Sequence, residues 1–170
     1  MDYILNRRSV REFDLTKKIS YEELVDLCRY GEAAPSARNQ KSREYIILDD
    51  KNLIDELSNT SKGSQVLKNC NTAIVVVGRD SALLTTPDMQ QADLAAATEN
   101  ILLAATKKGY GSCWIGVYPI KERMENSKKI LNIKGDKFVY SMIALGYPNS
   151  NEVFFDKEKF ELNMVFHNKE

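Results

Sequence analysis

Three arginines and one serine fall within five positions near the start of the chain: Arg7, Arg8, Ser9 and Arg11. Guanidinium groups offer forked donors that suit phosphate, and the serine adds a hydroxyl donor. The competing interpretation is a solvated basic turn, which the local sequence taken alone favours. The cluster is therefore a candidate anion site that depends on what the rest of the chain places beside it.

A loop of small residues and amides follows the first long helical pattern. Pro35 disfavours helical geometry at the residue before it, so the helix should end near residues 33–34. The residues after it, from Ser36 to Gln40, can bring backbone N–H groups and the Asn39 amide against a flat heterocycle. An ordinary connection between a helix and a strand is the alternative.

The only tryptophan, Trp114, lies on a glycine-flanked segment, GYGSCWIG at 109–116. Gly111 and Gly116 permit close backbone approach, so the strand can lie along a planar ring system. A core tryptophan in a tight strand is at least as good an interpretation on local grounds. Gly109-x-Gly111 does not continue into a dinucleotide-binding fingerprint, because Trp114 stands where the third glycine belongs.

Histidine and cysteine usage excludes several kinds of catalytic machinery. The single histidine, His167, lies three residues from the C-terminus, where a catalytic triad is not expected. Cys28, Cys70 and Cys113 have no C-x-x-C spacing and indicate neither a zinc site nor a disulfide framework. We assign no catalytic side chain and no metal ligand. If the protein is an enzyme, its chemistry should come from a bound organic cofactor.

Length and charge are those of one globular domain spanning 1–170. Hydrophobic residues make up 43% and charged residues 28% of the 170 positions. Lys plus Arg, 24, balances Asp plus Glu, 24, so no electrostatic footprint for nucleic acid or a membrane follows. The N-terminus lacks the layout of a signal peptide, and we expect a cytoplasmic protein.

The elements that must position the three segments follow from periodicity and capping signals. Helices are predicted over 2–6, 20–33, 51–58, 88–108 and 119–131, and strands over 44–48, 72–78, 112–118 and 137–145. Ser20 and Glu23 form a capping box. The run Thr72–Gly78 is typical of a strand buried on both faces. The result is an α+β fold: a sheet of four to five strands with helices on both faces.

The C-terminal part follows a different pattern from the rest of the chain. Beyond Pro148 it shows no clear periodicity until an apolar stretch between Phe160 and Phe166. An apolar tail after a polar loop predicts an arm, over about 150–170, that packs on something such as a second subunit.

Taken in order, the segments resemble the nitroreductase family of FMN-dependent oxidoreductases over nearly the whole chain. The matching segments are RRSVREF at 7–13, APSARNQ at 34–40, DLAAATENILLAATKKG at 93–109, GYGSCWIGVYP at 109–119 and ALGYP at 144–148. Each motif is weak by itself, and their order and spacing together are fairly specific.

The resemblance implies an α+β sandwich with a mostly antiparallel sheet that works as an intertwined homodimer, with two FMN molecules at the subunit interface. Family members take a hydride from NADH or NADPH onto the flavin and pass electrons to nitroaromatics, quinones or related acceptors. No acid–base side chain is obligatory in that scheme, because hydride transfer is direct and water can supply protons. A flavin-binding redox sensor or FMN store without physiological turnover is the alternative.

The resemblance also implies which residues bind the cofactor. The segment that holds the FMN phosphate, ribityl chain and pyrimidine edge matches Arg7, Arg8, Ser9 and Arg11. The loop from the other subunit matches Pro35, Ser36, Ala37 and Asn39. The strand whose backbone runs beside the isoalloxazine ring matches Trp114, Ile115 and Gly116. Reduced flavin gathers negative charge near N1 and O2, and Arg11 or a neighbour is the natural donor there.

Two departures from the family pattern bear on that site. Lys41-Ser42-Arg43 stands where the family usually has Gln-Pro-Trp, so we expect altered packing beneath the loop. Phe154 stands where the family often has an arginine that contacts the phosphate. That contact is expected to be missing or to come from Lys157 or Lys159.

Overall fold

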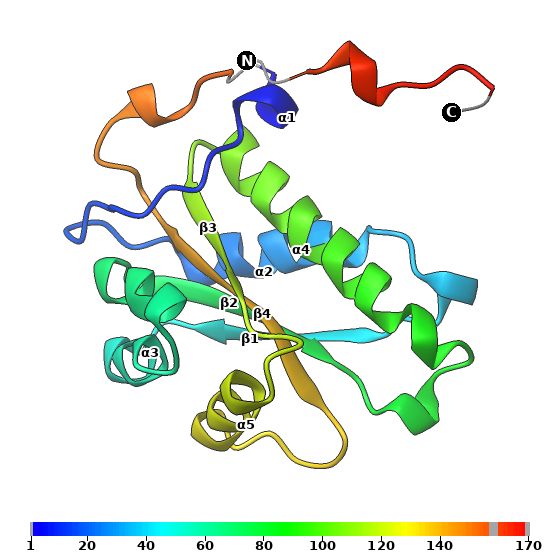
Figure 1. Ribbon diagram of the computed structural model, residues 1–170. Coiled ribbons are helices and arrows are strands. Elements are labelled where there is room, and N and C mark those ends of the chain that lie inside the picture. Colours follow the sequence, from blue (N-terminus) through cyan, green and yellow to red (C-terminus); the bar gives the residue numbers. More distant parts are fainter. Residues whose placement is uncertain (1, 157–159, 169–170) are drawn as a thin grey trace.

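A four-stranded antiparallel sheet forms the centre of the computed structural model, which describes residues 2–156 and 160–168 (Figure 1). The strand order is β1-β2-β4-β3. The strands are β1 (Arg43–Leu48), β2 (Thr72–Gly78), β3 (Gly111–Gly116) and β4 (Phe138–Gly146). The three pairings are all antiparallel. The α+β class and the strand count are as predicted.

The described residues form five α-helices: α1 (Tyr3–Asn6), which packs on α4, and α2 (Tyr21–Glu32), α3 (Lys51–Ser58), α4 (Gln90–Lys107) and α5 (Lys121–Ile130), which cover the sheet. The predicted helix over 88–108 begins later, because Pro87–Met89 is a separate 3-10 turn. The strand predicted to reach residue 118 ends at Gly116, because the N–H groups of Val117 and Tyr118 both turn to the Tyr140 carbonyl. A 3-10 segment at Lys62–Asn69 has no counterpart in the prediction, since its pattern fits neither a helix nor a strand.

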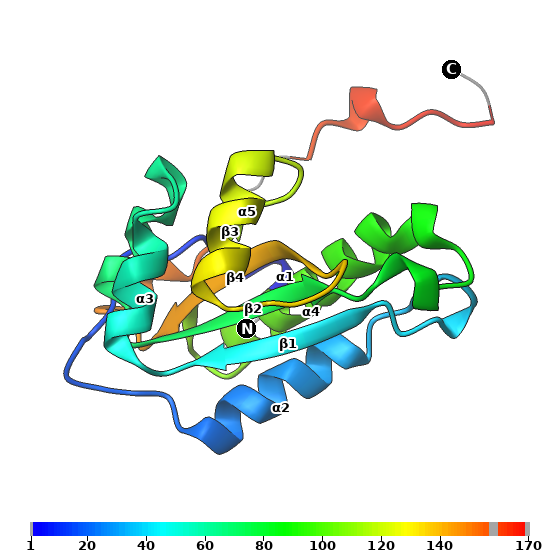
Figure 2. The same cartoon turned by 90° about the horizontal axis from the view of Figure 1, so that it is seen from below.

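The sheet separates two apolar cores, as expected for helices on both faces (Figure 2). On one face α2 and α4 cover Ile74, Val76 and Ile143. On the other, α3, the 62–69 segment and α5 cover Val75, Val77 and Met142. Every residue of β2 is buried, which explains its unbroken apolar run.

The start of α2 is capped by Ser20, whose Oγ accepts a hydrogen bond from the Glu23 N–H at 3.2 Å. This confirms one half of the predicted capping box. The Glu23 carboxylate instead accepts a hydrogen bond from Lys108 Nζ at 2.8 Å. The same ammonium lies 2.9 Å from Asp26 Oδ2, so the two carboxylates of α2 fix the end of α4.

The N-terminal segment runs along the outer edge of β3. The Val10 N–H donates to the Ser112 carbonyl at 2.9 Å, and Ser9 pairs with Ser112 in a parallel bridge. This approach depends on two glycines. A Cβ at Gly111 would lie 2.8 Å from Val10 Cγ1, and one at Gly146 would lie 2.9 Å from Phe13 Cδ1. The fold therefore brings the arginine segment against the strand that carries Trp114.

The described end of the chain, residues 160–168, leaves the body and places its apolar side chains in solvent (Figures 1 and 2). Phe160 is 75% exposed, Leu162 74% and Met164 71%. Such an apolar stretch is unusual for a surface that stays in water. Among the described residues, no helix is both long enough and apolar enough to cross a membrane.

Replacing Gly111 by alanine should push Val10 off the edge of β3. We expect the free energy of unfolding, measured by urea denaturation of the cofactor-free protein, to fall by about 1–3 kcal/mol, because the added methyl overpacks this junction. Gly116→Ala is the matched control: its Cβ would meet nothing within 4 Å in the described structure. That variant should stay within about 0.5 kcal/mol of the parent. Equal losses in the two variants would contradict the proposed crowding.

Candidate functional site

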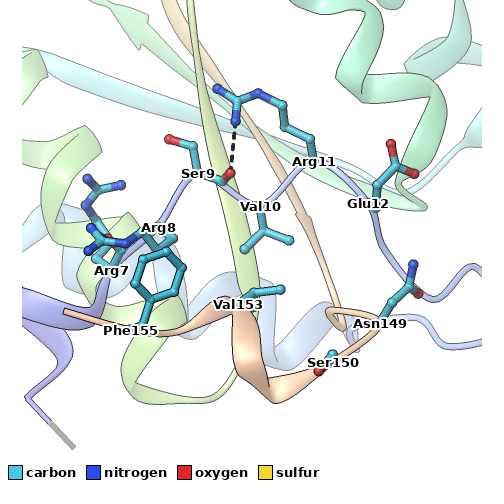
Figure 3. Close-up of a pocket in the computed structure, with 10 residues that line it drawn as sticks. All are labelled: Arg7, Arg8, Ser9, Val10, Arg11, Glu12, Asn149, Ser150, Val153 and Phe155. Atoms are coloured by element: carbon cyan, nitrogen blue, oxygen red, sulfur yellow. Dashed lines mark hydrogen bonds between the residues drawn. The ribbon is translucent and has the colours of Figure 1, made fainter. Parts of the chain in front are cut away.

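Two segments far apart in the sequence enclose a pocket of about 600 Å³, residues 7–12 and residues 149–155 (Figure 3). The first segment contributes all four members of the predicted arginine–serine cluster. The second contributes Asn149, Ser150, Val153 and Phe155, which the sequence analysis did not single out. The volume lies within the range of small-ligand sites.

The three arginines have different partners. Arg7 Nε lies 3.2 Å from Glu99 Oε1 on α4. Arg11 curls back so that Nη1 donates to the Ser9 carbonyl at 3.1 Å (Figure 3). Arg8 Nη1 donates to the Arg7 carbonyl at 3.0 Å, and the Phe155 ring lies over its guanidinium carbon with the centroid at 4.6 Å.

Unsatisfied buried polar atoms gather at this junction. Across the described residues, four buried side-chain nitrogen or oxygen atoms lack a hydrogen-bond partner. Three of them are Arg8 Nε, Arg8 Nη2 and Ser112 Oγ, and Ser112 is the residue that bridges to Ser9. Buried donors on a charged group are costly when unpaired, so this junction is a candidate site for an acceptor from outside the chain.

The pKa of the buried Cys113 thiol reflects how close two of these arginines lie to β3. Burial raises its pKa, and the nearby guanidiniums of Arg11 and Arg7 partly oppose that rise. Both arginines therefore act electrostatically on β3. The thiol stays protonated near neutral pH, which fits the absence of a nucleophile role in the sequence analysis.

The edge of β3 beyond Ser112 presents its backbone outward. Because the Ser112 carbonyl faces the N-terminal segment, alternation along the strand turns the N–H and C=O groups of Trp114 and Gly116 to the same edge. The Trp114 side chain is half-buried with the α4-side core, with its ring 6.3 Å from that of Tyr140. Ile115 is buried on the other face.

Gly116 leaves open space at the end of this edge, because a Cβ there would meet nothing within 4 Å in the described structure. Its carbonyl accepts a hydrogen bond from Arg123 Nη1 at 3.0 Å, a contact that the sequence did not indicate. Trp114 and Gly116 thus present amide groups at the free edge, whereas those of Ile115 face β4 and the tryptophan ring packs with the core.

The loop that carries Pro35, Ser36, Ala37 and Asn39 lies at the opposite end of the sheet (Figure 1). Arg43, just after it, pairs with Gly78, which pairs with Phe138, whereas Ser112 pairs with Leu145. The seven steps between Phe138 and Leu145 along β4 correspond to roughly 23 Å at about 3.3 Å per residue. One chain therefore does not bring this loop to its own arginine pocket.

The buried side chain of Arg43 anchors that loop. Arg43 Nη2 donates to the carbonyls of Glu32 and Ala34, at 2.7 and 2.5 Å, and Nη1 donates to that of Pro35 at 3.2 Å. Its side chain is 2% exposed, and Nε lies 3.3 Å from Glu32 Oε2. A change in packing was expected at this position. The change is that a charged guanidinium satisfies the backbone carbonyls at the end of α2.

Asp93 on α4 holds the other side of the loop and is also buried. Its Oδ1 accepts from the Ala37 N–H at 2.9 Å, and its Oδ2 accepts from Gln40 Nε2 and Ser42 Oγ, both at 2.8 Å. Between these anchors Arg38, Asn39 and Lys41 adopt positive φ, at 51°, 52° and 47°. The loop is therefore a fixed shape whose exposed tip carries Asn39.

The second departure from the family pattern, Phe154, has a defined position in the structure. Phe154 packs against the core on the α3 and α5 face of the sheet, and the next residue, Phe155, reaches the pocket. Lys157 and Lys159, the expected substitutes for the missing arginine, lie outside the described residues. No three His, Cys, Asp or Glu side chains cluster as a metal would require within residues 2–156 and 160–168.

The family model for nitroreductases matches residues 4–66 and 60–147. The chain belongs to the nitroreductase family. A protein of Archaeoglobus fulgidus named "Putative NADH dehydrogenase/NAD(P)H nitroreductase" is 38% identical over 156 residues, which cover 91% of this chain and 88% of that protein.

Solved nitroreductase-fold structures agree with the architecture. A Clostridium acetobutylicum protein described as a "Putative NADH Oxidase" has a TM-score of 0.92 at 39% identity and covers 99% of this chain and 100% of that one. An "FMN-dependent Nitroreductase" from Clostridium difficile has a TM-score of 0.89 at 25% identity and covers 99% and 98%. The nitroreductase fold is therefore shared over the whole chain.

In this nitroreductase-family chain, Arg43→Met should leave without a hydrogen-bond donor the carbonyls that the guanidinium satisfies. We expect a loss of about 1.5–3 kcal/mol in unfolding free energy, because hydrogen bonds from a charged donor to buried carbonyls are lost. Thermal denaturation measures it, and trypsin should cut after Arg38 or Lys41 sooner than in the parent. Arg29→Met is the control, because Arg29 forms an exposed ion pair with Asp26 and should cost under about 1 kcal/mol. Indistinguishable losses would rule out the anchoring role of Arg43.

Proposed function

We propose that this protein is an FMN-dependent oxidoreductase that takes a hydride from NADH or NADPH and reduces a nitroaromatic, a quinone or a similar acceptor. The observation that carries the proposal is a pocket lined by the arginine–serine cluster, on a segment that pairs with β3 at Ser112, beside the free amide edge of that strand. The names of the relatives above support both the cofactor and the electron donor.

The residues present fit FMN. The arginine–serine cluster lines the pocket and offers guanidinium and hydroxyl donors to the phosphate group. Trp114 and Gly116 offer backbone groups to the heterocycle along the β3 edge, and the absent Cβ of Gly116 leaves room for the ring. When bound, FMN supplies hydride acceptance and electron transfer to the acceptor.

Arg11 is the proposed cation for the pyrimidine edge of the flavin. It is exposed, it lies beside β3, and its guanidinium is held over the Ser9 carbonyl. A fixed positive charge at that place stabilises the negative charge that reduction adds to the ring. No side chain has to store a proton for hydride transfer, so a chain with one histidine can perform this reaction.

A homodimer completes the proposed site. The loop with Pro35, Ser36, Ala37 and Asn39 is too distant from the arginine pocket of its own chain, and its fixed, exposed tip suits contact with the flavin of a second copy. The exposed apolar stretch over residues 160–166 suits packing on that same copy. Both assignments follow the resemblance noted in the sequence.

A flavin store or redox sensor remains the second candidate function. The observation that favours it is Phe154, which packs in the core where a phosphate-binding arginine is frequent in the family. Turnover distinguishes the two functions. Steady reoxidation of the flavin by a nitroaromatic or quinone under continuous NADH supports the enzyme, and its absence supports the sensor.

The deciding experiment is a visible spectrum of the purified protein with and without added FMN, followed by anaerobic NADH or NADPH. We expect a flavin spectrum that bleaches on addition of the reduced nicotinamide. A colourless protein that does not bind added FMN would reject the proposal.

Arg11→Ala should weaken FMN binding by about 1.5–3 kcal/mol, because one hydrogen bond from a charged group is lost. Titration of the apoprotein by flavin fluorescence measures this change. Arg29→Ala removes another exposed arginine, on α2, and should bind FMN as the parent does. An unchanged affinity in Arg11→Ala would remove Arg11 from the site.

Asn39→Ala should impair the site of the other subunit. In a mixed dimer of this variant with an Arg11→Ala chain, one of the two flavin sites regains both side chains if the loop crosses the interface. We expect about half of the sites to bind FMN with parental affinity. If each chain binds with its own loop, every site in the mixed dimer carries one defect and no tight site appears.

A further inference from the structure

We infer that Arg123 selects negatively charged electron acceptors by binding a carboxylate that the reducible aromatic compound carries. The inference rests on the proposed function and names the acceptor class of that same site. The juxtaposition that carries it is a guanidinium of α5 held at the exposed Gly116 end of the free β3 edge, where open space remains.

Arg123 reaches this edge from a different element than the N-terminal arginines do. Its Nη1 donates at 3.0 Å to the Gly116 carbonyl, which alternation along β3 turns to the free edge. Gly116 lies four residues beyond Ser112, where the N-terminal segment pairs, which is roughly 13 Å at about 3.3 Å per residue. α5 follows that far end of the strand (Figure 1). Arg123 is thus a second cationic position on the edge, separate from residues 7–12.

The charge of Arg123 is not neutralised within the described residues. The bond to Gly116 is its side-chain hydrogen bond there, and no carboxylate lies within ion-pair distance. On α5 the positions three and four residues away hold no acid, and Glu122 and Glu125 face other sides of the helix. Nε and Nη2 are neither paired within those residues nor buried, so both are accessible to an anion from solvent.

Helix stability does not account for this arginine. Arg123 lies in the first turn of α5, where a positive charge opposes the helix dipole. Its bond to the Gly116 carbonyl nevertheless holds the guanidinium at the strand edge. The cation is therefore in place before a ligand arrives, which lowers the entropy that binding costs.

The surroundings of the guanidinium suit a small aromatic anion. A Cβ at Gly116 would meet nothing within 4 Å in the described structure. Between Gly116 and Arg123 the chain turns, with the Ile120 N–H donating to the Val117 carbonyl at 3.1 Å, and the Ile120 side chain is 44% exposed. This one turn thus presents an apolar side chain and a fixed cation next to the strand edge.

A carboxylate fits the donor set better than the diphosphate of a nicotinamide nucleotide does. One guanidinium offers a planar fork that matches the two oxygens of a carboxylate. A diphosphate carries charge on two phosphorus centres and takes donors from several groups. A substrate that approaches a ring held along β3 meets one fixed guanidinium at the Gly116 end, so we assign the contact to the acceptor.

The test compares 4-nitrobenzoate with 4-nitrobenzyl alcohol, which share the ring and the nitro group and differ in charge. The kcat/KM of each is measured with NADH in the full-length, FMN-loaded parent and in Arg123→Gln. We expect Arg123→Gln to lower the ratio of benzoate to alcohol at least tenfold, through a higher KM for 4-nitrobenzoate. The values for the alcohol should change less than twofold. Arg123→Lys, which keeps the charge without the fork, should give an intermediate ratio.

Binding without turnover gives a second measurement. Benzoate has no nitro group, so its dissociation constant from the oxidised FMN-loaded protein is measurable by isothermal titration calorimetry. We expect Arg123→Gln to raise this constant at least tenfold. Added salt should also raise it in the parent, because the contact is an accessible ion pair.

Lys129→Gln is the matched control, because it removes the same charge from an exposed position in the last turn of α5. It should leave the acceptor ratio and benzoate binding unchanged. An unchanged ratio in Arg123→Gln overturns the inference, and so does a higher KM for NADH without a change in that ratio. A parent that binds no FMN, or reduces neither acceptor, overturns the proposed function itself.

Discussion

The backbone pairing of the N-terminal segment with the edge of β3 is the interaction on which the rest of the site depends. A hydrogen bond from Val10 to the Ser112 carbonyl sets the register of both segments. It fixes the arginines beside the strand and leaves the outward amides of Trp114 and Gly116 open beyond the point of contact. The pairing exists because Gly111 and Gly146 lack the Cβ atoms that would collide with Val10 and Phe13.

The two ends of the sheet differ in how their charged side chains are paired. At the β3 end, Arg8 forms no ion pair with a carboxylate among the described residues, which favours the binding of an anion. At the other end, Arg43 and Asp93 are satisfied by backbone carbonyls and by N–H and hydroxyl donors, which creates a rigid loop. In the proposed homodimer, the loop of one copy would meet the arginine pocket of the other, because the two regions lie at opposite ends of β4.

Local patterns predict the elements and single out the candidate segments, but they do not reveal how the residues of those segments are paired. The buried run of β2 and the cap at Ser20 are properties of adjacent residues, so periodicity and capping predict them. The ion pair of Arg7 with Glu99, the ring of Phe155 over Arg8 and the role of Arg43 depend on contacts between distant segments. No spacing in the sequence encodes them. The 62–69 segment was missed because a 3-10 turn sequence carries neither helical nor strand periodicity.

The left-handed backbone at Arg38, Asn39 and Lys41 has a consequence for which side chains the loop can carry. Each non-glycine residue in that region costs about 1–2 kcal/mol. Glycine would remove this cost but would add about 0.4–1 kcal/mol of disorder to the unfolded chain, so much of the benefit cancels. The remainder, up to about 1.6 kcal/mol at each position, favours glycine, so folding alone does not explain the larger side chains there. The identities of these three residues are therefore open to selection by the molecule that contacts the tip of the loop.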